Sequence, residues 1–225
     1  MSDFDKPLPY TLLRSRRRTI ALQITPDGQL LVRCPFRVSK AAVDRFVAAH
    51  RDWILRHRQR LEALPPKPVF TYSAGQQLFY LGEPLSIVLR DDITGASVQG
   101  DMFLLPAHTD DPTALTADFF QREAQRLLPD MSAPWAEKMG LYPTKISITA
   151  AKTRWGSCSA KNTINFSYRL LCLPPELITY VVVHELAHLQ HHNHSAAFHA
   201  LVAQYLPDHK ELRAQLRTWA RVLPF

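Results

Sequence analysis

The sequence predicts an α+β protein, with a β-rich layer and helices in the first half and a helical domain with a short sheet in the second. Short runs of alternating apolar residues, separated by Gly and Pro turns, dominate residues 9–105. Apolar residues at helical spacing dominate residues 112–225. With 225 residues, 46% of them hydrophobic, the chain can bury the core of one large domain or of two small ones.

A hairpin and two helices are expected between residues 9 and 62. Leu22 and Val32 belong to two alternating runs that are typical of a half-buried hairpin. Ser39 is the expected N-cap of a helix that breaks near His50 and continues as a second, arginine-rich helix. The expected strands are residues 10–14, 19–25 and 29–34, with a turn at Pro26-Asp27-Gly28 before the last of them.

A proline-rich linker at residues 64–68 follows, and the chain then continues as short strands separated by glycine turns. These strands are expected at residues 77–81, 85–90 and 102–105, and the whole first half is interpreted as one β-rich layer. Three regions are therefore expected: a flexible N-terminus at 1–8, a β-rich subdomain with a basic helix at 9–105, and a helical domain at 106–225.

The helical domain is expected to begin with Asp111 as N-cap. Pro129 and Pro134 are expected to interrupt this helix, with helical character resuming to Met139 and stopping at Gly140. Strands are expected at residues 145–150 and 163–171, and Pro174-Pro175 begins an apolar helix.

The positive charge of the chain is concentrated at one end. The first 62 residues carry 13 Lys or Arg and 6 Asp or Glu, so the entire net charge of +7 lies in this N-terminal quarter. A solvated basic face explains such a distribution, and a nucleic-acid partner is the alternative.

Cysteine usage and hydropathy favour a soluble protein of the reducing cytoplasm, without a membrane partner. Three cysteines imply no disulfide framework, and the N-terminus lacks the apolar core of a signal peptide. No apolar run approaches the roughly 20 residues of a membrane span. The sequence contains no feature that fixes the oligomeric state.

The apolar helix carries two histidines and a glutamate in the motif His184-Glu185-Leu186-Ala187-His188. Because polar groups buried without partners cost several kcal/mol, these side chains need a role. His184 and His188 project from one helical face, where both imidazoles can reach one Zn²⁺ at about 2.0–2.1 Å. Glu185 is displaced by about 100° around the helix, which suits a general base acting on metal-bound water.

A catalytic zinc needs a third protein ligand and one open position. His194 is the preferred third ligand, because Asn193 and Ser195 favour a turn and the start of a helix at 196–205 that would return His194 to the metal. The alternative third ligands are His191, His192, His199 and Glu211. Histidines that are hydrogen-bonded in a core without any metal are a further alternative.

These motifs resemble the YgjP-like metallopeptidase family, bacterial proteins related to the SprT and Spartan proteases and more remotely to the minigluzincins. The resemblance lies in residues 154–158, 164–166, 181–188 and 193–195 with Phe198, and in residues 16–20, 26–28 and 37–39. It implies an α+β fold, a zincin-like metallopeptidase domain in 106–225, one zinc ion on three histidines, and peptidase activity on polypeptides.

The sequence departs from the better-known zinc peptidases, and at one position from the family pattern. His191 stands where metzincins have a glycine, and no methionine follows residue 139, so a metzincin assignment is excluded. His199 stands where the family pattern predicts Trp, which leaves the packing behind the zinc open.

Three residues are candidates for contacts with the transition state or the substrate: Arg154, Tyr168 and Tyr180. Surface pairing for the arginine and core packing for the tyrosines are the alternatives. Gly156 allows close backbone approach, so its segment forms either a strand edge that pairs with an extended peptide or an ordinary tight turn.

The predicted function is therefore a zinc metalloendopeptidase in which Glu185 takes a proton from the attacking water and passes it to the leaving amine. The alternatives are a nucleic-acid-associated, Spartan-like protease, a non-catalytic zinc-binding module, and a latent protease closed by its own N-terminal layer. Glu185 argues against the non-catalytic module, because a structural site usually fills all four positions with Cys or His.

Overall fold

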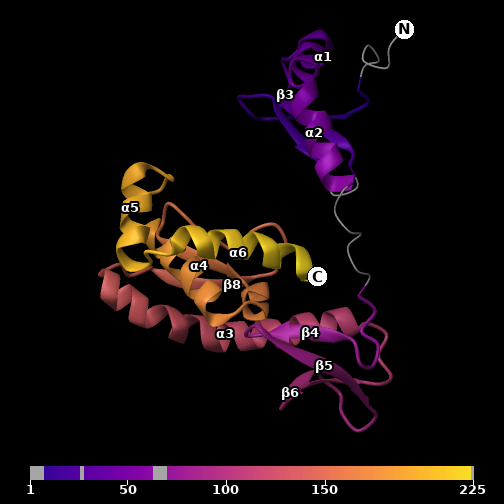
Figure 1. Cartoon of the computed structure of the whole chain (residues 1–225), viewed down its shortest axis with the longest axis vertical. Helices are drawn as coiled ribbons and strands as arrows, with labels where there is room; N and C mark the ends of the chain where they lie inside the picture. Colours follow the sequence, from indigo (N-terminus) through magenta and orange to yellow (C-terminus); the bar gives the residue numbers. More distant parts are fainter. Residues whose placement is uncertain (1–7, 26–27, 63–69, 224–225) are drawn as a thin grey trace. The chain divides into compact units, whose positions relative to one another are not determined.

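The computed structural model describes residues 8–25, 28–62 and 70–223. They hold six α-helices and three small sheets, which confirms the α+β class. The chain divides into two compact units, Met1–Pro66 and Lys67–Phe225 (Figure 1). Most of the expected N-terminus (1–7), two residues of the expected turn (26–27) and the expected linker (64–68) lie outside the described residues.

We expected the domain boundary between residues 105 and 106. The two units instead divide within the proline-rich segment, between Pro66 and Lys67. The strands of residues 9–105 belong to two separate sheets, one in each unit. The second of these sheets contacts the long helix that follows it in sequence, so its strands belong to the same unit as the C-terminal helices.

The first unit is a three-stranded sheet followed by two helices. Its strands are β1 (Thr11–Ser15), β2 (Ala21–Ile24) and β3 (Leu30–Pro35), in the order β1-β3-β2. The expected hairpin is confirmed, with Leu22 opposite Val32 in the antiparallel β2–β3 pair. The parallel pairing of β1 with β3 was not expected.

The helices of this unit are α1 (Lys40–Ala49) and α2 (Arg51–Glu62). Ser39 caps α1 as expected, because its side chain accepts a hydrogen bond from the Ala42 N–H at 3.2 Å. The expected break at His50 is confirmed. Val43 and Ile54, both fully buried, pack with the inner residues of β3 in a small core of their own.

The second unit begins with a four-stranded sheet in the order β4-β5-β7-β6. Its strands are β4 (Gln77–Tyr80), β5 (Glu83–Arg90), β6 (Ser97–Gln99), which was not expected, and β7 (Met102–Pro106). The β4–β5 turn meets the segment before helix α4: the Leu81 N–H donates to the Leu171 carbonyl at 2.6 Å. A Cβ on Gly82 would lie 2.8 Å from the Pro174 Cα, and its φ of +86° also favours glycine.

Helix α3 (Pro112–Met139) is continuous, so the expected interruption at Pro129 and Pro134 is wrong. Each proline removes one hydrogen bond to the carbonyl four residues earlier. Those carbonyls belong to Gln125 and Asp130, whose side chains are exposed, so water can satisfy them. The ends are as expected, with Asp111 as N-cap and a left-handed Gly140 as C-cap.

A three-stranded sheet follows α3 in the order β8-β10-β9, with β8 (Lys145–Thr149), β9 (Gly156–Cys158) and β10 (Thr163–Ser167). β9 is therefore an edge strand. The expected strand to residue 171 ends at Ser167, because the Ser167 side chain caps the 3-10 helix η2 (Tyr168–Cys172) by accepting from the Arg169 N–H.

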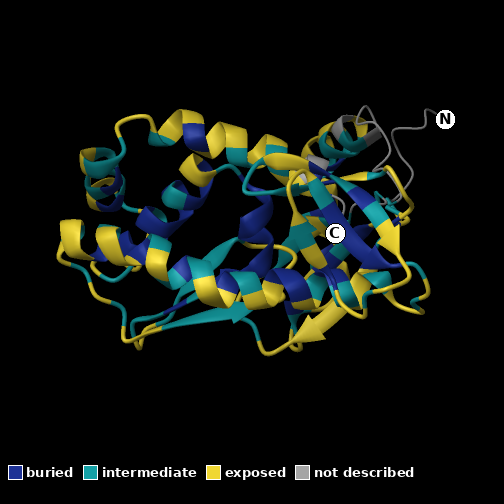
Figure 2. Cartoon of the chain, turned by 90° about the horizontal axis from the view of Figure 1, so that it is seen from below, coloured by how far each residue is buried: buried dark blue, intermediate teal, exposed yellow. Residues whose placement is uncertain are grey.

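Helix α4 (Pro175–Ala187) lies at the centre of the unit and contacts α3, α5 (Ala196–Tyr205), α6 (His209–Val222) and β9 (Figure 1). Figure 2 shows that the helices turn their buried residues inward and their exposed residues outward. Ser195 caps α5 as expected. Of the helices described, none is long and apolar enough to cross a membrane.

Candidate metal centre

Three imidazoles converge at the C-terminal end of α4. The ligand atoms of His184, His188 and His194 all lie within 4.8 Å of one another. The Nε2 atoms of His184 and His194 are 3.1 Å apart. Helical geometry places the first two on one face, and the Ser195 cap of α5 turns the chain so that His194 returns to them.

The tautomer of His188 is fixed by the backbone. Its Nδ1 lies 2.9 Å from the His191 carbonyl, which only accepts, so Nδ1 is the protonated nitrogen. Its Nε2 therefore keeps a free lone pair, the form that binds a metal. His191, one of the alternative third ligands, thus has a supporting contact through its carbonyl.

Phe198 forms the apolar floor beneath the three imidazoles. Its side chain is buried, and its ring centroid lies 4.9 Å from that of His184, 4.5 Å from that of His188 and 4.9 Å from that of His194. Phe198 thus supplies the packing behind the site that the sequence had left open. His199 lies at the side, with its ring centroid 6.3 Å from that of His194.

Burial favours the neutral form of two of these imidazoles, those of His184 and His194. Burial, reinforced by the neighbouring imidazoles, lowers the pKa of His184 to about 3. Partial burial and His188 also lower the pKa of His194. Neutral imidazoles are the form in which histidine binds a metal ion.

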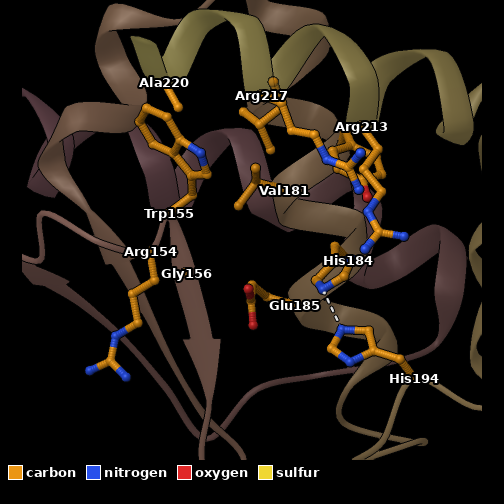
Figure 3. A pocket seen from close by; sticks show the side chains of 12 residues that line it. Arg154, Trp155, Gly156, Val181, His184, Glu185, His194, Arg213, Arg217 and Ala220 are labelled. Atoms are coloured by element: carbon orange, nitrogen blue, oxygen red, sulfur yellow. Dashed lines mark hydrogen bonds between the residues drawn. The ribbon is translucent and has the colours of Figure 1, made fainter. Parts of the chain in front are cut away.

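Glu185 lies beside this cluster without a partner. Its side chain is buried, and its Oε2 atom has no hydrogen-bond partner among the described residues. Burial raises the pKa of Glu185 to about 7, against the opposing charge of Arg154. Figure 3 shows its carboxylate between Gly156 and the imidazoles of His184 and His194.

The close approach of β9 sets the position of this carboxylate. A Cβ added to Gly156 would lie 2.7 Å from both Cγ and Oε1 of Glu185, closer than any ordinary contact. A larger residue would have to displace the glutamate side chain, because the strand backbone lies directly against it.

The residues present fit a zinc ion. Two nitrogens that bind one tetrahedral zinc at about 2.0–2.1 Å are about 3.4 Å apart, close to the 3.1 Å between the His184 and His194 Nε2 atoms. Three imidazoles, with a Glu185 Oε2 atom beside them that has no partner among the described residues, form a donor set that leaves a coordination position of a metal ion open.

Two pockets flank the site and share Gly156, His184, Glu185 and His194. One, which we call the arginine-side pocket, has a volume of about 350 Å³ and is also lined by Arg154, Trp155, Tyr180, Val181, Arg213, Leu216, Arg217 and Ala220. The other, the histidine-side pocket, has about 440 Å³ and is also lined by Ser157, Cys158, Ala160, His188 and His192.

The three candidate contact residues lie in different places. Arg154 and Tyr180 line the arginine-side pocket, but Figure 3 shows the Arg154 guanidinium directed away from the Glu185 carboxylate. Tyr168 is buried in the core and lines neither pocket.

The family model described as "YgjP-like, metallopeptidase domain" matches residues 18–218. The chain belongs to the YgjP-like metallopeptidase family. The family resemblance inferred from the sequence is thereby confirmed. This family is one of metal-dependent proteases, and the His cluster of the YgjP-like chain can hold a metal ion.

Among solved structures, the YgjP-like chain is similar to the metallopeptidase zymogen of Pyrococcus abyssi abylysin. The identity is 26%, the match covers 41% of this chain and 93% of that chain, and the TM-score is 0.38. At this TM-score the likeness supports no structural conclusion. A comparison with curated proteins found no match.

Sequence reasoning missed α6, which supplies one wall of the arginine-side pocket through Arg213 and Arg217. The sequence pattern of a helix was present, because Leu212, Leu216 and Trp219 recur at helical spacing. The sequence could not place this helix against α4, because that contact depends on the fold as a whole.

Proposed function

We propose that this protein is a zinc-dependent metalloendopeptidase, with His184, His188 and His194 as zinc ligands and Glu185 as general base. The observation that carries the proposal is the buried Glu185 carboxylate, whose Oε2 has no partner among the described residues, beside three convergent imidazoles. Such a carboxylate is costly to keep in a folded protein unless it acts on something that enters the site.

A zinc ion bound there supplies Lewis acidity toward water and toward a peptide carbonyl. Glu185 takes a proton from the attacking water on the open side of the site, and its pKa of about 7 makes it an effective base at neutral pH. The same carboxyl group then protonates the leaving amine. Phe198 excludes water from the opposite side of the imidazoles.

The edge strand β9 can pair with a substrate peptide. Backbone hydrogen bonds join Trp155 to Ser167 and Ser159 to Thr163, at 2.8 and 2.9 Å. By the alternation of an antiparallel pair, the N–H and C=O groups of Gly156 and Cys158 point away from β10, to the free edge. An extended substrate can pair with these groups directly over Glu185.

The two pockets favour an endopeptidase over an exopeptidase. They lie on two sides of the shared residues Glu185 and His194, so substrate residues before and after the scissile bond both have space. The same open arrangement argues against a non-catalytic zinc module, since a closed site would leave no room for a substrate.

Nucleic acid is not included in the proposed function. Part of the basic charge of the first unit is already engaged: Arg14 donates to the carbonyls of Phe36 and Val38, and Lys40 pairs with Asp44 at 3.0 Å. Binding to DNA that weakens steeply as salt is added would extend the function to a nucleic-acid-associated protease.

The proposed function is tested by comparing the wild-type protein with Glu185→Gln on an unfolded protein substrate. We expect the variant to bind zinc as the wild type does and to lose activity by at least a factor of about 10²–10⁴. Equal hydrolysis by the two proteins would refute the role of Glu185. The absence of hydrolysis by zinc-loaded wild type would refute the peptidase proposal.

A further inference from the structure

The arginine-side pocket combines an apolar interior with positive charge at its rim. Trp155, Val181, Leu216 and Ala220 supply apolar walls, whereas the only charged side chains besides Glu185 are arginines. Its volume of about 350 Å³ lies within the usual range for ligand pockets, and it begins directly beside the proposed general base. A substrate residue next to the scissile bond can therefore enter it.

Two of these arginines come from one face of α6. Arg213 and Arg217 are four residues apart, and Leu216 and Ala220 lie on the same helical face and line the same pocket. Figure 3 shows both guanidinium groups at the side of the pocket where His184 lies. Both arginines are exposed to solvent at the rim of the pocket, where a substrate that enters can reach them.

No acidic group balances this pair in the described structure. Arg213 and Arg217 take part in none of the ion pairs between described residues, and Glu185 is the one acidic residue that lines the pocket. Like charges four residues apart on a helix repel each other. An anion bound between the two arginines would offset this repulsion.

The two arginines line the same pocket as the reacting groups. Arg213 and Arg217 share it with His184, Glu185 and His194. A carboxylate bound by the arginines would therefore lie beside the site of cleavage.

We propose that Arg213 and Arg217 form a specificity subsite that binds a carboxylate of the polypeptide substrate. The inference rests on the proposed peptidase function and names its substrate class: peptides with an acidic side chain, or a free chain terminus, close to the cleaved bond. Arginine recognises carboxylates through paired, charge-assisted hydrogen bonds, and the apolar walls of Leu216 and Trp155 accommodate the methylene groups that precede the carboxylate.

The test is a cleavage-site profile of the zinc-loaded enzyme on a proteome-derived peptide library, once with free and once with amidated C-termini. We expect Asp and Glu to be enriched at one fixed position next to the cut. Enrichment of Asp and Glu in both libraries assigns an acidic side chain, whereas cleavage at a fixed distance from the C-terminus that is lost on amidation assigns a chain terminus. A profile with neither preference would overturn the proposal.

Variants on α6 sharpen the test. Arg217→Glu is expected to shift the preference from acidic toward Lys-containing peptides, and Arg213→Ala to lower kcat/KM for acidic peptides by about tenfold. Lys210→Ala removes an exposed cation of the same helix that does not line the pocket, and it should leave the profile unchanged. An unaltered profile in Arg217→Glu would contradict the subsite.

A binding assay separates failure of the subsite from failure of the peptidase proposal. Two synthetic peptides that differ only by Glu or Gln at one position are titrated into the zinc-loaded Glu185→Gln protein. Tighter binding of the Glu peptide supports the subsite even if no hydrolysis is detected. This preference should be lost when Arg217→Glu is added to the Glu185→Gln protein. The Glu or Gln residue is then placed at each position of the peptide in turn. If the two peptides of every such pair bind equally well, the subsite is refuted.

Discussion

Gly156 and Glu185 are in close contact: a Cβ at position 156 would lie 2.7 Å from Cγ and Oε1 of the glutamate, so any other residue would displace the glutamate side chain or the strand. The edge strand β9 and the central helix α4 are thereby held at a fixed distance, which sets the carboxylate beside the three imidazoles. The position of the proposed base thus depends on a residue with no side chain.

Gly156→Ala should therefore impair catalysis without removing the metal. The added methyl group displaces the carboxylate or the strand, and a misplacement of about 1 Å can cost about 10²-fold in rate. We expect kcat/KM to fall by about that factor while zinc content stays at the wild-type value. Gly95→Ala is the matched control, since nothing lies within 4 Å of a Cβ at that position. Equal activity of both variants would show that the contact is unimportant.

Phe198→Ala should weaken both the fold and the metal site. Removing a fully buried Phe costs about 3–5 kcal/mol of stability. Because Phe198 packs against all three imidazoles, we also expect zinc affinity to fall by about 10–100-fold.

Phe120→Ala provides the comparison for this variant, since Phe120 is equally buried and lies on α3 away from the histidines. It should lose similar stability by thermal unfolding of the metal-free protein but keep its zinc affinity in a competition titration. Wild-type zinc affinity in Phe198→Ala would contradict the role assigned to this ring.

Glu123→Gln should reveal a pH-dependent contribution to stability. Arg126 and then Tyr80 lower the pKa of Glu123 by donating hydrogen bonds to its Oε2 at 2.7 and 2.8 Å. The carboxylate therefore stabilises the fold above its unfolded pKa of about 4.3, and this contribution is lost as the pH falls through the lower folded value.

We expect Glu123→Gln to be less stable than wild type by about 1 kcal/mol at pH 7, with the difference shrinking as the pH falls below about 4. Thermal midpoints across this range measure it. Glu137→Gln, an exposed substitution in the same helix, should change the midpoint little. A difference between wild type and Glu123→Gln that is constant with pH would contradict the assignment.

Local features of the site and fold could be predicted from the sequence, because they depend on spacing and capping within a few residues. His184 and His188 share a helical face, and the caps formed by Ser39, Asp111 and Ser195 all begin helices where expected. The cluster of three histidines with Glu185 beside it was likewise expected from one segment of the chain.

Features that depend on distant segments could not be predicted in this way. The contact between Gly156 and Glu185, the parallel pairing of β1 with β3 and the placement of α6 against α4 join parts of the chain that no local pattern relates. The continuous helix through Pro129 shows the opposite error. A local rule was overridden there, at a turn where Gln125, whose carbonyl loses its partner, is an exposed residue.

Zinc stoichiometry in a set of histidine variants tests the central claim most directly. We expect one tightly bound zinc ion per chain in the wild type and in His192→Ala and His199→Ala, which change neighbouring histidines outside the cluster. His184→Ala, His188→Ala and His194→Ala should each lose most of the zinc under the same dialysis. Wild-type zinc retention in His194→Ala, or loss of zinc in His192→Ala, would contradict the proposed ligand set.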